Sequence, residues 1–208
     1  MKLLSILAGA LAAVSLAGSA YAIGPKAYVG NFKDNTVSVI DTDAGRAIAT
    51  VPVAAGPDGI VIARDNSQVF VSGSGASSLS VIDGASDQIT GTIEVGKGPQ
   101  GLAATPDGRW VLVAVNGEDR IVFINTATLA VAASVPVAKP HTIAIRPGGT
   151  QAYVTSQEPG HFSLAVIDLA ARKVSSRIAL DKMPRDLEFG HDDNALYLTA
   201  PRPEVRGF

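Results

Sequence analysis

The sequence predicts an all-β fold built from repeated four-stranded antiparallel sheets, and three recurring landmarks carry that prediction. A short β-prone run recurs at 27–31, 69–73, 111–113, 152–156 and 196–200. An apolar pair followed by Asp or Asn recurs at 39–41, 81–83, 123–125 and 166–168. A proline recurs at Pro57, Pro99, Pro140 and Pro184. All three share a period of about 42 residues, which is typical of propeller blades of four strands each.

Each repeat divides into four short strands joined by tight turns. In the second repeat we expect strands at 59–63, 68–72, 78–82 and 88–95. Apolar and polar residues alternate in 36–40 and 78–82, the period of a strand. The run 105–108 fits a type I turn, and Pro147-Gly148 suits a type II turn. Hairpins this short predict antiparallel meanders, and their radial repetition lets each blade cover its neighbour's apolar face.

Several repeated residues have a structural interpretation. Asx side chains close the third strand of each repeat, at Asp41, Asp83, Asn125 and Asp168. Such a side chain can accept backbone N–H groups of the turn that follows. The repeated prolines set the entry into each inner strand, and Trp110, the sole tryptophan, is expected to pack between blades.

The N-terminal segment predicts export. Lys2 precedes an apolar run over 3–16, and small residues lead to Ala20-Tyr21-Ala22, so residues 1–22 are predicted to be a secretory signal peptide. The run is shorter than the roughly 20 residues that a spanning helix needs. Residues 23–208 would form a soluble propeller domain in the bacterial periplasm or beyond. The chain has no cysteine, so neither a lipoprotein anchor nor a disulfide framework is expected.

Charge and motifs disfavour several classes of function. The formal net charge is −2, and the basic residues are spread among acids, whereas duplex DNA or an anionic membrane calls for a concentrated basic patch. No nucleic-acid partner and no membrane span in the mature chain are therefore expected. No nucleophile elbow, phosphate-binding loop or His-Glu-x-x-His run occurs. We therefore assign no catalytic residue.

Three motifs carry a family resemblance. They are Tyr-Val-Thr-Ser at 153–156, Ser-Val-Ile-Asp at 38–41 and 80–83, and Gly-Pro followed two residues later by Gly at 56–59 and 98–101. They resemble the repeats of YVTN-family β-propellers. The resemblance implies a propeller, usually of seven blades, found in periplasmic and surface proteins. Its relatives include propellers of nitrite reductases, amine dehydrogenase heavy chains and some lactonases, so it implies no single chemistry.

Counting strands predicts an incomplete ring. The first repeat lacks its inner strand, three full repeats follow, and the last contributes two strands, which makes about four and a half blades. Because a seven-bladed ring needs about 28 strands, we expect a truncated propeller whose C-terminal blades are missing. Its open end blades would favour self-association.

The topology also predicts where a ligand would bind. The loop between blades and the loop between a blade's second and third strands open on one face, where the residues after the repeated prolines form a ring: Asp58, Gln100, His141 and Arg185. The loops around it lie at 31–35, 73–77, 116–119 and 157–161, the last of which includes His161. The opposite face is expected to carry only turn residues, with His191 among them. The ring and His161 are our predicted ligand-binding residues.

Two functions remain open at this stage. One is a non-catalytic propeller that binds a small molecule, a peptide or a protein partner. The other is a cofactor-handling or lactonase-like hydrolytic propeller, which only His141, Arg185 and Asp186 suggest. The spacing of His141 and His161 matches no zinc motif, so no metal or haem site is predicted there.

Overall fold

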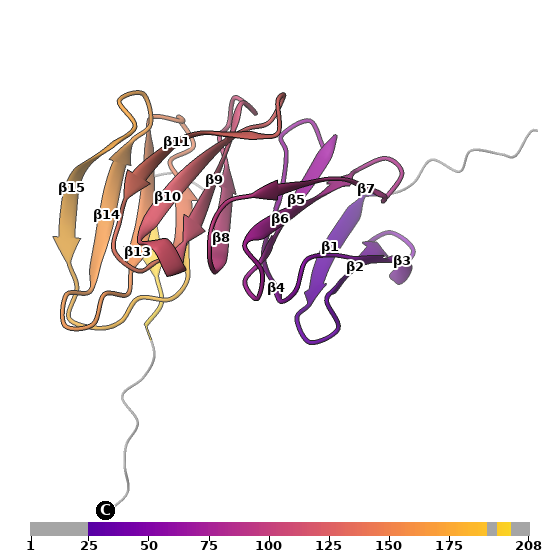
Figure 1. The fold of residues 1–208 in the computed structure, drawn as a ribbon, viewed down its shortest axis with the longest axis horizontal. Coiled ribbons are helices and arrows are strands. Elements are labelled where there is room, and N and C mark those ends of the chain that lie inside the picture. Colours follow the sequence, from indigo (N-terminus) through magenta and orange to yellow (C-terminus); the bar gives the residue numbers. More distant parts are fainter. Residues whose placement is uncertain (1–24, 191–194, 201–208) are drawn as a thin grey trace, which may run out of the picture.

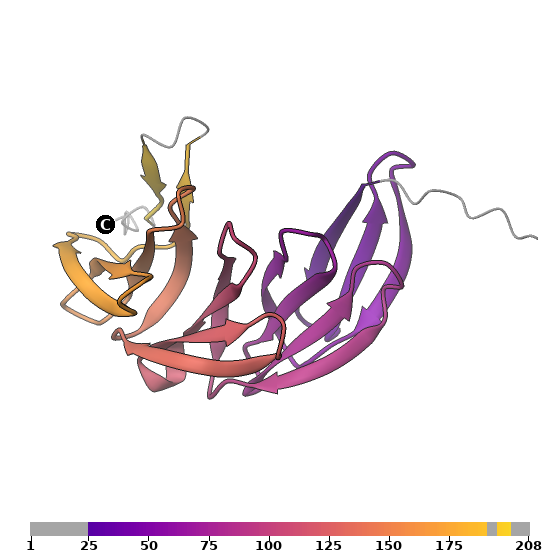
Figure 2. The same ribbon diagram turned by 90° about the horizontal axis from the view of Figure 1, so that it is seen from above.

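The computed structural model describes residues 25–190 and 195–200. The predicted signal peptide at 1–22 and His191 lie outside these residues. Within them, five antiparallel sheets follow one another in chain order around an arc, with β1–β3 at one end and β16–β17 at the other (Figures 1 and 2).

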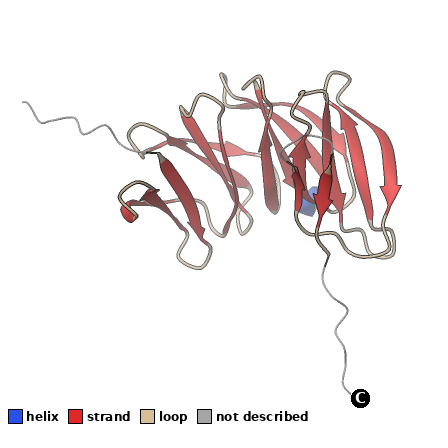
Figure 3. Cartoon of the chain, turned by 180° about the vertical axis from the view of Figure 1, so that it is seen from behind, coloured by secondary structure: helices blue, strands red, loops and turns tan. Residues whose placement is uncertain are grey.

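The strands match the predicted succession of blades. Blade 1 contains β1 (Lys26–Asn31), β2 (Thr36–Asp41) and β3 (Arg46–Pro52). Blade 2 contains β4 (Pro57–Ile62), β5 (Gln68–Gly73), β6 (Ser78–Asp83) and β7 (Ile89–Glu94). Blade 3 contains β8 (Pro99–Ala104), β9 (Trp110–Val115), β10 (Arg120–Asn125) and β11 (Ala130–Pro136), with the 3-10 turn η1 (Asn116–Glu118) before β10. Blade 4 contains β12 (Pro140–Ile145), β13 (Gln151–Ser156), β14 (Ser163–Asp168) and β15 (Lys173–Ala179), and blade 5 contains β16 (Leu187–Phe189) and β17 (Leu196–Leu198). The predicted all-β architecture of four-stranded antiparallel blades is therefore confirmed, and Figure 3 shows strands in every blade.

The core lies between blades. One buried cluster joins residues of blades 1 and 2, among them Val37 and Val71, and another joins Phe70 of blade 2 to Val113 of blade 3. A third cluster links Phe123 of blade 3 to blade 4, and a fourth links blade 4 to blade 5. Each blade thus buries its apolar faces against its neighbours, as the alternating strand pattern predicts.

The inner strand of the second repeat begins at Pro57, two residues before the predicted range 59–63, because the proline belongs to the ladder. Pro57 pairs with Gly73, and the register then shifts before Ile60 pairs with Val71. The same shift follows Pro99 and Pro140. The residues after Pro57, Pro99 and Pro140 therefore lie in β-bulges, irregularities that re-aim side chains.

One turn differs from its prediction. The amide of Gly108 donates to the carbonyl of Thr105 at 2.9 Å, as a type I turn requires. The amide of Gly149 likewise donates to the carbonyl of Arg146 at 2.7 Å, but the positive φ (68°) belongs to Gly149 and not to Gly148. A type II turn needs the positive φ at Gly148, so that prediction was wrong. Both turns have a left-handed glycine as their fourth residue.

The Asx interpretation is confirmed. The side-chain oxygen of Asp41 accepts the amides of Asp43 and Ala44 at 3.0 and 2.9 Å. The other three side chains accept turn amides in the same way, namely those of Asp83, Asn125 and Asp168. These residues hold the turns between the third and fourth strands and are not free to bind a ligand through the same oxygen.

One position at each blade junction varies in chemistry. It is a left-handed residue in the turn before the outer strand: Asp87 in blade 2, Leu129 in blade 3 and Arg172 in blade 4. Asp87 forms an ion pair with Lys26 of blade 1. Leu129 packs against the core between blades 2 and 3. Arg172 lies over the ring of Trp110 of blade 3. We call this position the latch residue.

Candidate functional site

Two sets of loops meet on one face, as predicted. The amide of Ser74 donates to the carbonyl of Gly56 at 2.8 Å, which joins the loop inside blade 2 to the loop that enters it. The amide of Gly117 donates to Lys97 at 3.0 Å, and the amide of Gln157 donates to Lys139 at 2.8 Å. We call this the loop face, and the opposite one the turn face.

The inner strands approach closely where the predicted ring begins. Asp58, Gln100 and His141 are the second residues of β4, β8 and β12. A methyl group added at Gly101 would meet the carbonyl oxygen of His141, and one added at Gly59 would meet that of Gln100, both well inside normal contact. Only glycine has room at these two positions. Gly59 and Gly101 therefore allow neighbouring inner strands, and the ring residues on them, to lie close together.

Hydroxyl groups fix the backbone beside the ring. The amides two residues after the repeated prolines donate to Ser or Thr side chains of the adjacent strand: Gly59 to Ser72 (2.8 Å), Thr142 to Thr155 (2.8 Å) and Asp186 to Thr199 (3.0 Å). Blade 3 has Ala114 and blade 1 has Gly30 where the other three blades have the hydroxyl. These bonds satisfy amides that the bulge removes from the ladder.

His141 is partly buried and lies within the field of three charged side chains. Its Nδ1 is 2.8 Å from the hydroxyl of Thr142. Burial lowers the pKa of His141; Asp58 opposes that change, Arg185 reinforces it and Asp186 opposes it. The charges of Asp58 in blade 2 and Arg185 at the entry to blade 5 therefore act on His141 in blade 4. The lowered pKa means that the imidazole is mostly neutral at pH 7, when it can both donate and accept a hydrogen bond.

Gln100 lies between Asp58 and His141 in the order of the blades. Its Oε1 is buried and accepts no hydrogen bond from any described residue. A buried acceptor without a donor costs about 1–3 kcal/mol. The hydrogen bonding of Gln100 is therefore incomplete among the described residues.

His161 lies on the loop face but away from the ring. It is exposed and lines a hollow of about 610 Å³ at the outer part of blade 4, with Glu158, Phe162 and Arg177. None of the four ring residues lines that hollow. The structure thus separates the two histidines that the sequence grouped together.

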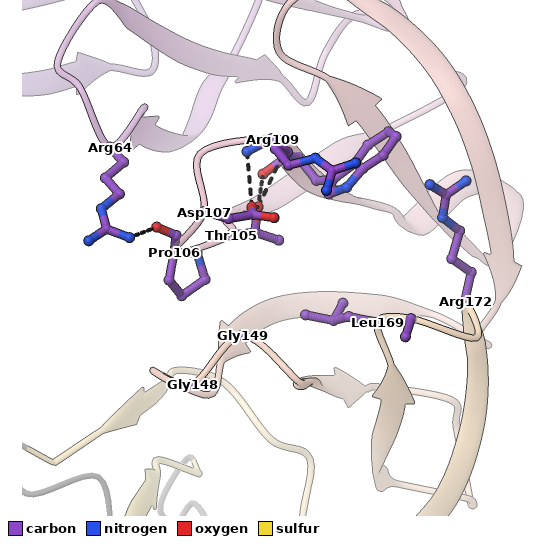
Figure 4. Close-up of a pocket in the computed structure, with 11 residues that line it drawn as sticks. Arg64, Thr105, Pro106, Asp107, Arg109, Gly148, Gly149, Leu169 and Arg172 are labelled. Carbon is purple, nitrogen blue, oxygen red and sulfur yellow. Dashed lines mark hydrogen bonds between the residues drawn. The ribbon is translucent and has the colours of Figure 1, made fainter.

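The turn face carries a feature that sequence reasoning missed. A hollow of about 550 Å³ opens between blades 3 and 4, beside Trp110 (Figure 4). Three arginines of three blades line it: Arg64, Arg109 and Arg172. Trp110 packs against the core between these blades, as predicted, but it also lines this hollow. Alignment of the turns across repeats would have placed the arginines on one face.

Metal binding finds no support in the described part of the chain. Within 25–190 and 195–200, no three His, Cys, Asp or Glu residues gather closely enough to hold a metal ion. The described helical segment is a single short turn, and no described helix is long and apolar enough to cross a membrane.

Known proteins resemble the chain in fold. A family model described as YNCE-like beta-propeller matches residues 6–107. Hydrazine synthase from Kuenenia stuttgartiensis is similar at 22% identity and a TM-score of 0.80, over 86% of this chain and 53% of that one. Dihydro-heme d1 dehydrogenase NirN, in complex with DHE, is similar at 20% identity and a TM-score of 0.68, over 84% of this chain and 39% of that one. No curated protein matches the sequence.

These similarities establish the fold and no more. The chain spans about half of the length of the hydrazine synthase chain and less of the NirN chain. At such identities a shared propeller does not carry over an activity, because one propeller scaffold supports many chemistries.

Proposed function

We propose that the chain is an exported, non-catalytic β-propeller that binds a small molecule, a peptide or a protein partner at the ring of Asp58, Gln100, His141 and Arg185. The observation that carries the proposal is the variation of the ring. The same backbone position holds a carboxylate, an amide, an imidazole and a guanidinium on successive blades. A rigid scaffold that presents different polar groups at one mouth is the usual form of a binding site.

The ring chemistry favours a polar ligand with both donors and acceptors. Asp58 and Asp186 are negative and Arg185 is positive, so the three leave a formal charge of −1 and the site offers groups of both signs. Gln100 adds an amide, a group that can both donate and accept hydrogen bonds. Neutral His141 offers a donor or an acceptor through the ring nitrogen that does not face Thr142. A peptide segment or an amide-bearing metabolite satisfies these groups better than a strong anion or a bare cation.

Export rests on the predicted leader at residues 1–22. Mass spectrometry of protein recovered from the periplasm should find a new N-terminus at or near Ile23. Exported protein that retains Met1 would contradict this part of the proposal.

A cofactor-handling propeller is the second candidate. One similar structure is named for a dehydrogenase of dihydro-heme d1, and His141 supplies an imidazole at the mouth of the ring. A single imidazole offers at most one axial ligand to a haem iron. Titration with hemin, followed by its absorption spectrum, separates this candidate from the first. A spectral change that disappears in His141→Ala would favour it.

The binding experiment uses His141 as the reporter. A panel of short peptides and amide-bearing metabolites is screened by NMR for a shift of the His141 imidazole signals, and the affinity of each hit is measured by calorimetry. His141→Ala combined with Arg185→Ala should weaken binding by about tenfold or more, since each change removes a polar partner. Thermal stability should stay within about 1 kcal/mol, as surface changes usually allow.

His161→Ala is the matched control, because it removes a histidine from the same face outside the ring. It should leave the affinity unchanged. Unchanged binding in the double variant would move the site elsewhere, and loss of the fold would make His141 and Arg185 structural.

A further inference from the structure

The hollow on the turn face has the size and the construction of a small-molecule site. Its volume is about 550 Å³, within the roughly 300–1,000 Å³ that ligand pockets occupy. Arg64 comes from the β4–β5 turn of blade 2, Arg109 from the β8–β9 turn of blade 3 and Arg172 from the β14–β15 turn of blade 4. In Figure 4, Arg64 and Arg172 lie on opposite sides of the turn that carries Asp107 and Arg109.

The charge of the hollow is strongly positive. Three guanidinium groups face one carboxylate, that of Asp107, so the lining has a formal charge of +2. The whole chain has a formal charge of −2, so this concentration of positive charge is local. Among the described residues, none of the three arginines forms an ion pair.

Asp107 is engaged by its own turn. Its carboxylate accepts the hydroxyl of Thr105 at 2.5 Å and the amide of Arg109 at 3.0 Å. These bonds, the first above all, keep its pKa below the ordinary value, so it remains ionised in the turn. It lowers the positive potential near Arg109 but forms no ion pair with that guanidinium.

Two of the arginines are already oriented. The guanidinium carbon of Arg172 lies 4.4 Å from the centre of the Trp110 ring and 5.8 Å from that of Phe123, and Arg64 donates to the carbonyl of Pro106. Stacking on an aromatic face uses the plane of a guanidinium and leaves its N–H edge available. An oriented N–H edge matches the paired oxygens of a carboxylate or a phosphate.

We infer that this hollow is a second binding site, which takes a small organic anion through its carboxylate or phosphate groups. The site lies on the face opposite the ring and shares no residue with it. It therefore does not depend on the function proposed above.

The test is calorimetry on the full chain with two probes, citrate for carboxylates and inorganic pyrophosphate for phosphates. Saturable binding of at least one probe is expected. Arg64→Gln and Arg109→Gln should each weaken it by about tenfold, the loss expected when one charged hydrogen-bonding partner is removed. Both arginines are exposed, so neither change should unfold the protein.

Arg146→Gln is the matched control. Arg146 is exposed in the β12–β13 turn of the same face and does not line the hollow, so its loss should change the affinity less than about twofold.

Binding of citrate alone would show that the site takes carboxylates, and binding of pyrophosphate alone would show that it takes phosphates. Failure of both probes to bind, or an equal loss in Arg146→Gln, would overturn the inference. The ring variant with His141→Ala and Arg185→Ala should bind the probe as the native chain does.

Discussion

The junction between blades 1 and 2 and the junction between blades 3 and 4 use equivalent positions with different chemistry. Lys26 begins β1 and Trp110 begins β9, and each faces the latch residue of the next blade. At the first junction, Lys26 and Asp87 form an ion pair at 2.9 Å, with only 10% of each side chain exposed. At the other, Arg172 stacks on Trp110 beside an open hollow.

The difference shows how a repeated scaffold acquires a site. Lys26 and Asp87 neutralise each other, and Lys26 also donates to the carbonyl of Gly84, so that junction is satisfied internally. Trp110 leaves the charge of Arg172 uncompensated. At the latch position, Asp87 is therefore neutralised within the junction between blades 1 and 2. Arg172, at the junction between blades 3 and 4, keeps a positive charge that an anionic ligand could neutralise.

The largest effect is expected at the closed junction. Asp87→Asn keeps the size of the side chain and suits the left-handed backbone (φ 57°), but it leaves the ammonium of Lys26 without a counter-ion. Breaking a buried ion pair on one side costs about 3 kcal/mol. Urea denaturation should find that loss in the free energy of unfolding. Asp43→Asn, on an exposed turn of blade 1, should change it by less than about 0.5 kcal/mol. A loss below about 1 kcal/mol in Asp87→Asn would mean that the pair does not hold the blades together.

A second change tests the inner end of the junction between blades 3 and 4. Gly101→Ala would push a methyl group against the carbonyl of His141 and separate β8 from β12. Overpacking of this kind costs about 2 kcal/mol. The matched control is Gly148→Ala, where an added methyl group meets nothing within 4 Å and φ is not positive. Equal free energies of unfolding for the two variants would show that β8 and β12 can accommodate a methyl group at Gly101 without cost.

The stacked latch should contribute less than the ion pair. Arg172→Gln removes the contact with Trp110 and should lower the free energy of unfolding by about 1 kcal/mol. Because Trp110 is the only tryptophan, tryptophan fluorescence reports on the surroundings of this one side chain. A shifted emission spectrum is expected in the folded variant. A native spectrum in Arg172→Gln would argue against the stacking.

The smallest effect concerns alkaline pH. Burial, together with the hydrogen bond from the Tyr28 hydroxyl to Asp87 at 3.0 Å and the charge of Asp87, raises the pKa of Tyr28 above its ordinary value of 10.0. A raised pKa contributes stability that is fully present below about pH 10 and is lost as the pH rises further. The unfolding free energy of the native chain should therefore fall more between pH 9 and about pH 11 than that of Tyr28→Phe. Equal decreases in the unfolding free energy of the two proteins would show that the Tyr28 hydroxyl does not contribute to the junction between blades 1 and 2.

The sequence predicted the blades well because their landmarks repeat. The prolines and the Asx residues recur in register, so strand order, hairpin pairing and the shared loop face follow from topology. The ring was accessible for the same reason, since Asp58, Gln100 and His141 occupy one repeated position. The hollow was not predicted, because its arginines occupy no single repeated position: Arg64 and Arg109 stand at different places in equivalent turns, and Arg172 lies in a turn of another kind. The turn at Pro147 was also misjudged, because two adjacent glycines left the position of the positive φ open to sequence reasoning.

If side chains of different blades form one ring around His141, the pKa of its imidazole depends on residues of blades 2 and 5. NMR titration of the imidazole should give a pKa below the ordinary value of 6.5. Asp58→Asn, which removes a favourable charge in blade 2, should lower the pKa further. Arg185→Gln, which removes an opposing charge in blade 5, should raise it. A pKa that stays the same in both variants would rule out a shared site, because Asp58 and Arg185 would then lie too far from His141 to act on it.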